Sequence, residues 1–267
     1  TQILELLQNK CYVNEWYLKN STINYLNNEC KYFNTDEVVI SNVRTFKPIE
    51  PKQPSFHSLE LIDKMFFTDI EDNLTTYLKT LFTPDEVFTA KKNYFITGTN
   101  LKWNNATIFW QINEKEKVHA GKMMLYDVTT GKRIKEPYNH INWVHKAINE
   151  KDFTINQCLF GLHNITEDYS KTIAIVESEK TAIIMSIILP DFFWLASGSK
   201  GNFKFELLEP LKNRNVIAFP DKGEYNNWLN KATELNALGF KISVSDLIEN
   251  TEFNNGFDLA DYYIKTN

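Results

Sequence analysis

The chain has 267 residues, of which 43% are hydrophobic and 14% aromatic, and its formal net charge is -5 at pH 7. This composition excludes a disordered protein, and the length suffices for one large domain or two ordinary ones. No apolar stretch reaches the roughly 20 residues that a membrane-spanning helix needs, so we expect a cytoplasmic protein with no membrane partner. Three widely spaced cysteines fit neither a disulfide framework nor paired zinc ligands.

The first half of the chain is predicted to be mainly helical. Residues 1–46 carry apolar side chains at helical spacing and form an N-terminal helical segment. Three prolines between residues 48 and 54 predict a stiff linker over 47–55. Helical spacing returns over 59–66 and 74–82, and the sequence TPDE at 83–86 can cap a further helical turn.

The second half changes character twice. Short runs rich in β-branched and aromatic residues predict a curved antiparallel sheet, with strands at 94–96, 107–112 and 118–126. From residue 171, apolar strands alternate with helices, which predicts a parallel sheet with helices on both faces. The expected strands are 172–177, 193–196, 216–219 and 241–245, and the expected helices are 179–189, 203–211 and 226–238. We therefore predict a strand-rich α+β subdomain over 56–170 and an α/β domain over 171–267.

Charge is distributed unevenly along the chain. Residues 91–150 contain ten Lys or Arg against five acids, a local charge of +5, so the rest of the chain carries -10. A basic region beside an acidic one suits a polyanion led toward a metal site, because lysines neutralise phosphates while carboxylates hold the cation. The alternative is an ordinary solvated face. Aromatic residues within this region could stack on bases, although aromatics in strands more often belong to a core.

Acidic residues follow two strands of the predicted parallel sheet. Glu177 comes after the apolar run 173–176, Asp221 comes after 216–220, and Asp258 and Asp261 form a later pair. Ligand sites of parallel sheets lie beyond the carboxyl ends of the strands, and Mg²⁺ prefers a few hard oxygens together with water and phosphate. The sequence therefore predicts a metal site at these acids. Acids in such places also cap the helices that follow, which is the alternative for each of them.

Four ordered motifs resemble the Toprim domains of DnaG-type primases. IAIVESEKTA (173–182) is similar to the Toprim glutamate motif, ASG (196–198) to the turn after the second strand, FPD (219–221) to the aspartate motif, and FDLAD (257–261) to the late acidic element of primases. CLFGLH (158–163) resembles the segment that precedes Toprim in these primases, and residues 107–126 resemble their strand-rich subdomain. The resemblance covers about residues 90–264. It is closest to uncharacterised primase-like Toprim proteins of Bacteroidetes mobile elements.

The resemblance implies roles for particular residues. Glu177 matches the Toprim glutamate, a general acid/base or metal ligand, and Asp221 matches the first aspartate of an Asp-x-Asp pair. The implied cofactor is Mg²⁺ or Mn²⁺, with Asp258 and Asp261 as further ligands. Gly223 stands where the second aspartate belongs and cannot bind a metal. Glu224 follows it, but a longer side chain from a shifted backbone position is a poor replacement.

The expected function is Mg²⁺-dependent nucleotidyl transfer on single-stranded DNA, in replication or mobile-element maintenance. The alternatives are a nucleic-acid-binding module that has lost catalysis through the Gly223 departure, or a Toprim nuclease. Expected partners are single-stranded DNA or another nucleic acid, nucleotides, and a helicase or other replication protein. The chain lacks the zinc ribbon that primases carry upstream, which is consistent with a fragment of a longer protein. The expected nucleic-acid contacts are Lys91, Lys92, Lys102, Lys122, Lys132, Arg133 and Lys200.

Overall fold

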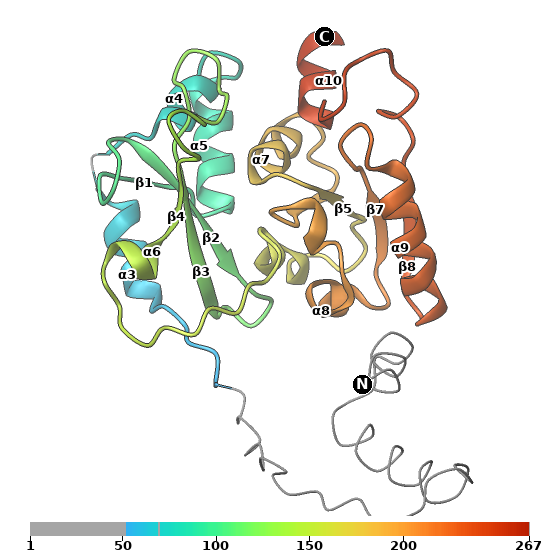
Figure 1. Cartoon of the computed structure of the whole chain (residues 1–267), viewed down its shortest axis with the longest axis horizontal. Coiled ribbons are helices and arrows are strands. Elements are labelled where there is room, and N and C mark those ends of the chain that lie inside the picture. Colours follow the sequence, from blue (N-terminus) through green and yellow to red (C-terminus); the bar gives the residue numbers. More distant parts are fainter. Residues whose placement is uncertain (1–51, 69, 267) are drawn as a thin grey trace, which may run out of the picture. The chain divides into compact units, whose positions relative to one another are not determined.

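The structure is a computed structural model that describes residues 52–68 and 70–266 (Figure 1). The predictions for the helical segment 1–46 and for residues 47–51 of the linker lie outside the described residues. Two four-stranded sheets organise the described part, with strand orders β1-β2-β3-β4 and β6-β5-β7-β8. The first sheet is antiparallel and the second is parallel, as the sequence predicted.

Within the described residues, three helices precede the first sheet: α3 (Leu59–Phe66), α4 (Asn73–Leu78) and α5 (Pro84–Asn93). The predicted cap of α5 is confirmed, because the Thr83 hydroxyl accepts from the Glu86 backbone N–H and the Glu86 carboxylate accepts from the Thr83 backbone N–H. This reciprocal arrangement satisfies two backbone donors that the helix start would otherwise leave unpaired. It begins a helix of ten residues.

The antiparallel sheet consists of β1 (Thr97–Thr99), β2 (Ala106–Ile112), β3 (Val118–Met124) and β4 (Ile141–Trp143), and a short helix, α6 (Val144–Ala147), follows it. The first strand begins three residues later than the expected strand at 94–96. Tyr94 still belongs to the end of α5, where its backbone N–H donates to Ala90, and Phe95 has a positive φ of 51°. Strand β4 was not predicted.

The parallel sheet confirms the alternation of strand and helix. Its strands are β5 (Ile173–Val176), β6 (Phe193–Ala196), β7 (Asn215–Ala218) and β8 (Lys241–Val244). The helices of this half are α7 (Glu179–Ile188), α8 (Phe205–Leu208), α9 (Tyr225–Ala237) and α10 (Leu259–Thr266), with 3-10 turns at η1 (Leu162–Thr166), η2 (Lys200–Asn202) and η3 (Glu209–Leu211). The helix expected over 203–211 is divided into α8 and η3 at Pro210, whose ring and missing N–H disfavour a continuous α-helix.

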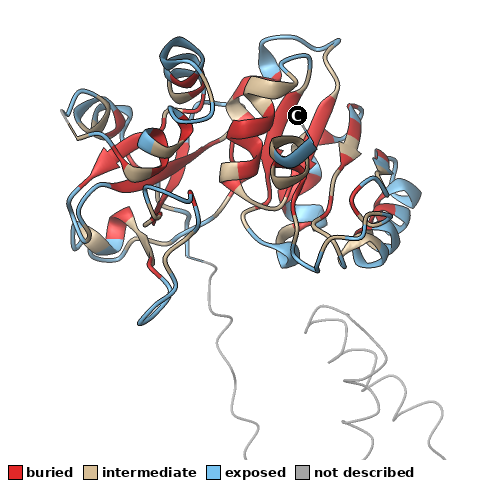
Figure 2. Ribbon diagram, turned by 90° about the horizontal axis from the view of Figure 1, so that it is seen from above, coloured by how far each residue is buried: buried red, intermediate tan, exposed pale blue. Residues whose placement is uncertain are grey.

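Helices cover both faces of the parallel sheet, as predicted. Ala174 and Val176 of β5 pack with α7 and α10 on one face, whereas Ile173 and Ile175 pack with α8 and α9 on the other. Figure 2 shows buried residues concentrated in the strands of both sheets. The antiparallel sheet also contributes to the first cluster, for example through Phe109. The two sheets therefore share this cluster, while each also has a cluster of its own, and the domain boundary near residue 170 stays a prediction.

No helix in the described ranges combines the length and the apolarity that crossing a bilayer requires.

Candidate functional site

Strands β5 and β7 bring two acidic residues to the same edge of the parallel sheet. They pair in parallel with Ile175 opposite Ala218, and the Phe219 backbone N–H donates to the Ile175 carbonyl over 2.8 Å. Glu177 follows the end of β5 and Asp221 follows the end of β7. The structure thus places both at the carboxyl ends of adjacent strands, where parallel sheets bind their ligands.

Other side chains, not Glu177, form the helix caps at this edge. The Ser178 hydroxyl accepts from the Thr181 backbone N–H over 3.1 Å and caps α7. Asp258 accepts from the Asp261 backbone N–H over 2.8 Å at the start of α10, and its second oxygen accepts from the Thr181 hydroxyl over 2.8 Å. The capping alternative therefore describes Asp258 well, while Glu177 is left for another role.

Glu177 lies in an environment that disfavours its charge. Burial, followed by the neighbouring carboxylate of Glu224, raises the pKa of Glu177 to about 7, against an opposing effect of Lys200. Its Oε1 atom is buried and has no hydrogen-bond partner. A buried carboxylate oxygen without a partner carries a large desolvation penalty, which a cation or a proton would relieve.

Asp221 is the most strongly perturbed acid of this edge. Burial, and then the carboxylates of Glu177, Asp258, Asp261 and Glu224, raise the pKa of Asp221 to about 8. Like charges that share a site cannot all ionise without cost. The structure therefore brings the predicted acids within electrostatic reach of one another, with more negative charge than the protein itself compensates.

Lys200 reaches the acidic edge beside Glu177. Lys200 donates to Glu224 over 2.8 Å, and Asn227 donates to the other oxygen of Glu224 over 2.8 Å. Both carboxylate oxygens of Glu224 thus accept hydrogen bonds from neighbouring side chains. Glu224 is therefore not a simple substitute for the missing aspartate as a metal ligand. Lys200 is exposed, and its hydrogen bond to Glu224, with a smaller contribution from the charge of Glu177, raises the pKa of its ammonium. Its contact with a phosphate stays a prediction.

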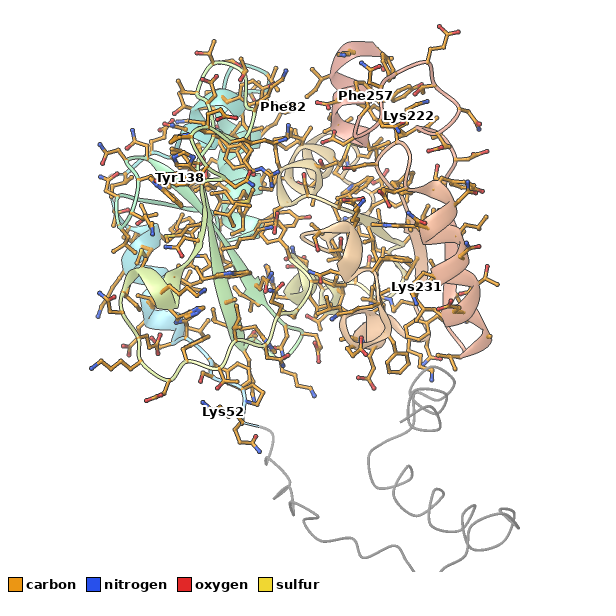
Figure 3. All side chains as sticks on the ribbon, viewed as in Figure 1. Lys52, Phe82, Tyr138, Lys222, Lys231 and Phe257 are labelled. Carbon is orange, nitrogen blue, oxygen red and sulfur yellow. The ribbon has the colours of Figure 1, made fainter. Side chains whose placement is uncertain are left out.

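Gly223 forms a turn that a residue with a side chain would not easily adopt. Its φ is +93°, and a Cβ atom there would lie 3.2 Å from the Asn255 side chain. Its backbone N–H donates to the Glu249 carboxylate over 2.8 Å. The adjacent Lys222 backbone N–H donates to the Phe257 carbonyl over 2.9 Å, and Figure 3 shows these two residues side by side. At the position of the absent aspartate, the chain therefore forms a turn with a positive φ, a conformation that favours glycine.

The residues at this edge suit a small hard cation with few protein ligands. Within residues 52–68 and 70–266, no three His, Cys, Asp or Glu side chains are grouped so as to hold a metal ion. Mg²⁺ is commonly held by one or two carboxylates, with waters and substrate phosphates in the remaining positions. The unpartnered Oε1 of Glu177 and the crowded Asp221 fit that pattern, whereas Asp258 already uses both oxygens in hydrogen bonds.

The predicted nucleic-acid contacts differ in how accessible they are. Lys92, Lys102 and Lys132 are exposed, and Arg133 is partly buried. Lys91 lies 3.5 Å from the buried carboxylate of Asp72, so part of its charge is already compensated. Exposed lysines can contact the phosphates of a nucleic acid. Of the predicted aromatic residues, Phe109, Trp110 and Tyr126 are buried in the core, whereas Trp103 and Trp143 are partly buried.

Lys122 occupies a different environment from the one predicted. Its ammonium donates to Glu179 over 2.9 Å and to the Gly198 carbonyl over 3.0 Å, and its side chain is 9% exposed. Lys122 is therefore committed to internal partners, which corrects its prediction as a nucleic-acid contact. The sequence carried no signal for this ion pair, because its two residues are 57 positions apart and lie on different elements, Lys122 on β3 and Glu179 on α7.

Comparison with known proteins identifies one family and several similar folds. The model of the family described as "Domain of unknown function (DUF6371)" matches residues 72–222, which include Glu177 and Asp221. No curated protein matches the sequence. Among solved structures, the chain is similar to the primase catalytic core of E. coli, with 13% identity over 78% of this chain and 74% of that one and a TM-score of 0.46.

Two further solved structures show similar values. A DnaG primase catalytic domain bound to ssDNA has 11% identity over 78% of this chain and 72% of that one, with a TM-score of 0.48. The primase fragment of the bacteriophage T7 primase-helicase protein has 12% identity over 67% of this chain and 66% of that one, with a TM-score of 0.43. At identities this low, the likeness concerns the fold alone.

Proposed function

This chain belongs to the family described as a domain of unknown function (DUF6371), and we propose that it is a primase-like Toprim protein that joins nucleotides on single-stranded DNA with Mg²⁺ or Mn²⁺. The observation that carries the proposal is the pair of carboxylates at adjacent strand ends, Glu177 and Asp221. Both have raised pKa values, and Glu177 has a buried oxygen without a partner. Uncompensated charge of this kind is typical of functional sites.

Each residue of the site has a part in the proposed reaction. Glu177 and Asp221 would hold the metal ion, which when bound supplies positive charge to the phosphates of the nucleotide. Lys200, at the end of a small-residue loop, would bind a phosphate oxygen and help to orient it. The exposed lysines Lys92 and Lys132 would contact the DNA backbone and bind it without regard to sequence. A helicase or another replication protein remains a proposed partner.

The direct test is ribonucleotide incorporation on a single-stranded DNA template with Mg²⁺ or Mn²⁺. We expect the full chain to extend products and Glu177→Gln to reduce the rate at least about 100-fold, the effect expected when a group that stabilises charge in the transition state is lost. Glu209→Gln, at an exposed glutamate of η3, is the matched control and should retain full activity. Equal activity of Glu177→Gln and the control would refute the proposal.

A second candidate is a binding module that keeps the fold without catalysis. The turn at Gly223 favours it, because this position offers no carboxylate to a second metal ion. Such a protein would bind single-stranded DNA with an affinity that falls steeply with salt and does not change with EDTA. Loss of binding in EDTA, or any turnover, would exclude this candidate. Nicking of supercoiled plasmid would instead identify a Toprim nuclease.

A further inference from the structure

A buried ion pair joins the antiparallel sheet to the turn that carries Glu177. Lys122, on β3, donates to Glu179 at the first turn of α7 over 2.9 Å, and the two side chains are 9% and 2% exposed. Removing two charges from water is costly, and well-packed apolar residues in their place are often as stable or more so. The stability of the fold alone therefore does not require this pair.

The same ammonium also holds the loop that follows β6. Lys122 donates to the Gly198 carbonyl over 3.0 Å, and the Gly198 backbone N–H donates to the Glu177 carbonyl over 2.8 Å. Gly198 has φ +77°, and a Cβ atom there would lie 3.1 Å from a carboxylate oxygen of Glu179. The loop thus approaches the ion pair as closely as a residue without a side chain permits.

These contacts connect the end of β5, which carries Glu177, with the loop after β6, which leads to Lys200. The loop continues from Gly198 to Lys200, which pairs with Glu224 over 2.8 Å beside the acidic edge. The turn from Glu177 to Glu179 lies on the other side of the Lys122 ammonium. The Lys122 ammonium therefore restrains the first turn of α7, two residues after Glu177, and the loop at Gly198, two residues before Lys200.

We propose that Lys122 and Glu179 are positioning residues, which fix the turn at Glu177 and the loop at Lys200 relative to each other, so that the metal ion that Glu177 would hold and the ammonium of Lys200 act on one phosphate. The proposal rests on the proposed function and extends it, since it assigns the relative placement of Glu177 and Lys200 to a pair that touches neither substrate nor metal. Neither Lys122 nor Glu179 is a catalytic residue in this account. Loss of the pair should loosen the loop and misplace Lys200, while the sheets stay folded.

The test removes both charges together in the full chain, as Lys122→Met with Glu179→Met, so that no unpaired charge is left in the core. The matched control is Lys231→Met with Glu234→Met, which removes an exposed ion pair of 2.6 Å on α9. We expect both double variants to keep the urea midpoint of the wild type. Only the first should lose about 100-fold in kcat for nucleotide incorporation, the effect of a misplacement near 1 Å. If Lys122→Met with Glu179→Met kept both the kcat and the stability of the wild type, the proposal would be overturned.

Hydrogen exchange provides a readout that does not depend on activity. Amides of residues 197–201 should exchange faster in the first double variant, while those of β8 stay unchanged. An inactive wild-type protein would refute the proposed function, yet this comparison would still decide the role of the ion pair. If the double variant does not fold, Glu179→Gln keeps an acceptor for Lys122 and serves instead. Unchanged exchange over 197–201 in the folded variant would overturn the proposal.

Discussion

Replacement of Asp221 by asparagine should make the metal-free protein more stable. The native carboxylate is held near four other acids, and burial is the largest cause of its raised pKa, with Glu177 the next. An amide has nearly the same shape and carries no charge at any pH. The variant should therefore avoid the cost of ionising a carboxyl group in this place.

The difference between the pKa of Asp221 in the folded protein and in the unfolded chain sets the size of this gain in stability. The pKa of Asp221 rises from an ordinary 3.8 to about 8 in the folded protein. One pKa unit corresponds to about 1.4 kcal/mol, so the largest gain in unfolding free energy that Asp221→Asn can give at pH 7 is roughly 4 kcal/mol. Because protein interiors relax around charges, we expect about 1 to 3 kcal/mol.

The sign of the pH dependence follows from the same shift. The unfolded chain ionises Asp221 at a lower pH than the folded protein, so the stability of the wild type falls as pH rises from about 4 to about 8. The advantage of Asp221→Asn should therefore grow over this range. Below pH 4 both states of the wild type carry the protonated acid, and the advantage should vanish.

The assay is urea unfolding in EDTA at pH 5, 7 and 8, repeated with Mg²⁺. Asp191→Asn, at an exposed aspartate that precedes β6, is the control and should change nothing. Mg²⁺ should stabilise the wild type and the control, but not Asp221→Asn. A variant less stable than the wild type in EDTA, or an advantage that does not grow with pH, would refute the reasoning.

Three further predictions concern single substitutions. Lys122→Met should cost about 3 to 5 kcal/mol in urea unfolding, because it leaves Glu179 buried and unpaired; a loss below 1 kcal/mol would contradict this. Gly223→Asp should not restore a ligand and should cost about 1 to 3 kcal/mol for its positive φ, and tighter Mg²⁺ binding by calorimetry would prove this wrong. Lys132→Ala should reduce the salt dependence of single-stranded DNA affinity by about 0.7 in the log–log slope, and an unchanged slope would exclude Lys132 as a phosphate contact.

Local rules predicted the parallel half of the molecule well. Its strands β5 and β6 are short apolar runs buried on both faces, and the helix α9 ends before Gly239, whose φ is +91°. These signals lie within a few residues of the feature they define. Strand β4 carries no such signal, because three residues of intermediate exposure gain their structure from pairing with β3.

Only part of the candidate site could be predicted from the sequence, because some of its contacts also join residues far apart in the chain. Glu177 and Asp221 follow recognisable strands, so a parallel sheet brings them to one edge. Lys122 was expected at the surface because lysine seldom lies in a core without a partner. Its partner Glu179 is distant in the sequence, and only the packing of the two sheets brings them together.

The turn at Gly223 shows a second limit. The sequence showed that a ligand is missing, but the residues that stabilise the turn come from the segment before α10. The Glu249 carboxylate accepts a hydrogen bond from the Gly223 N–H, and a Cβ at Gly223 would lie 3.2 Å from the side chain of Asn255. Neither contact follows from a local pattern, since both join positions about 30 residues apart.

The most direct measurement of the central claim is anomalous diffraction from crystals of the full chain soaked in Mn²⁺. We expect a peak between the carboxylates of Glu177 and Asp221, and its loss in crystals of Asp221→Asn. A peak that persists in the variant, or no density at this edge of the sheet at high Mn²⁺ concentration, would contradict it.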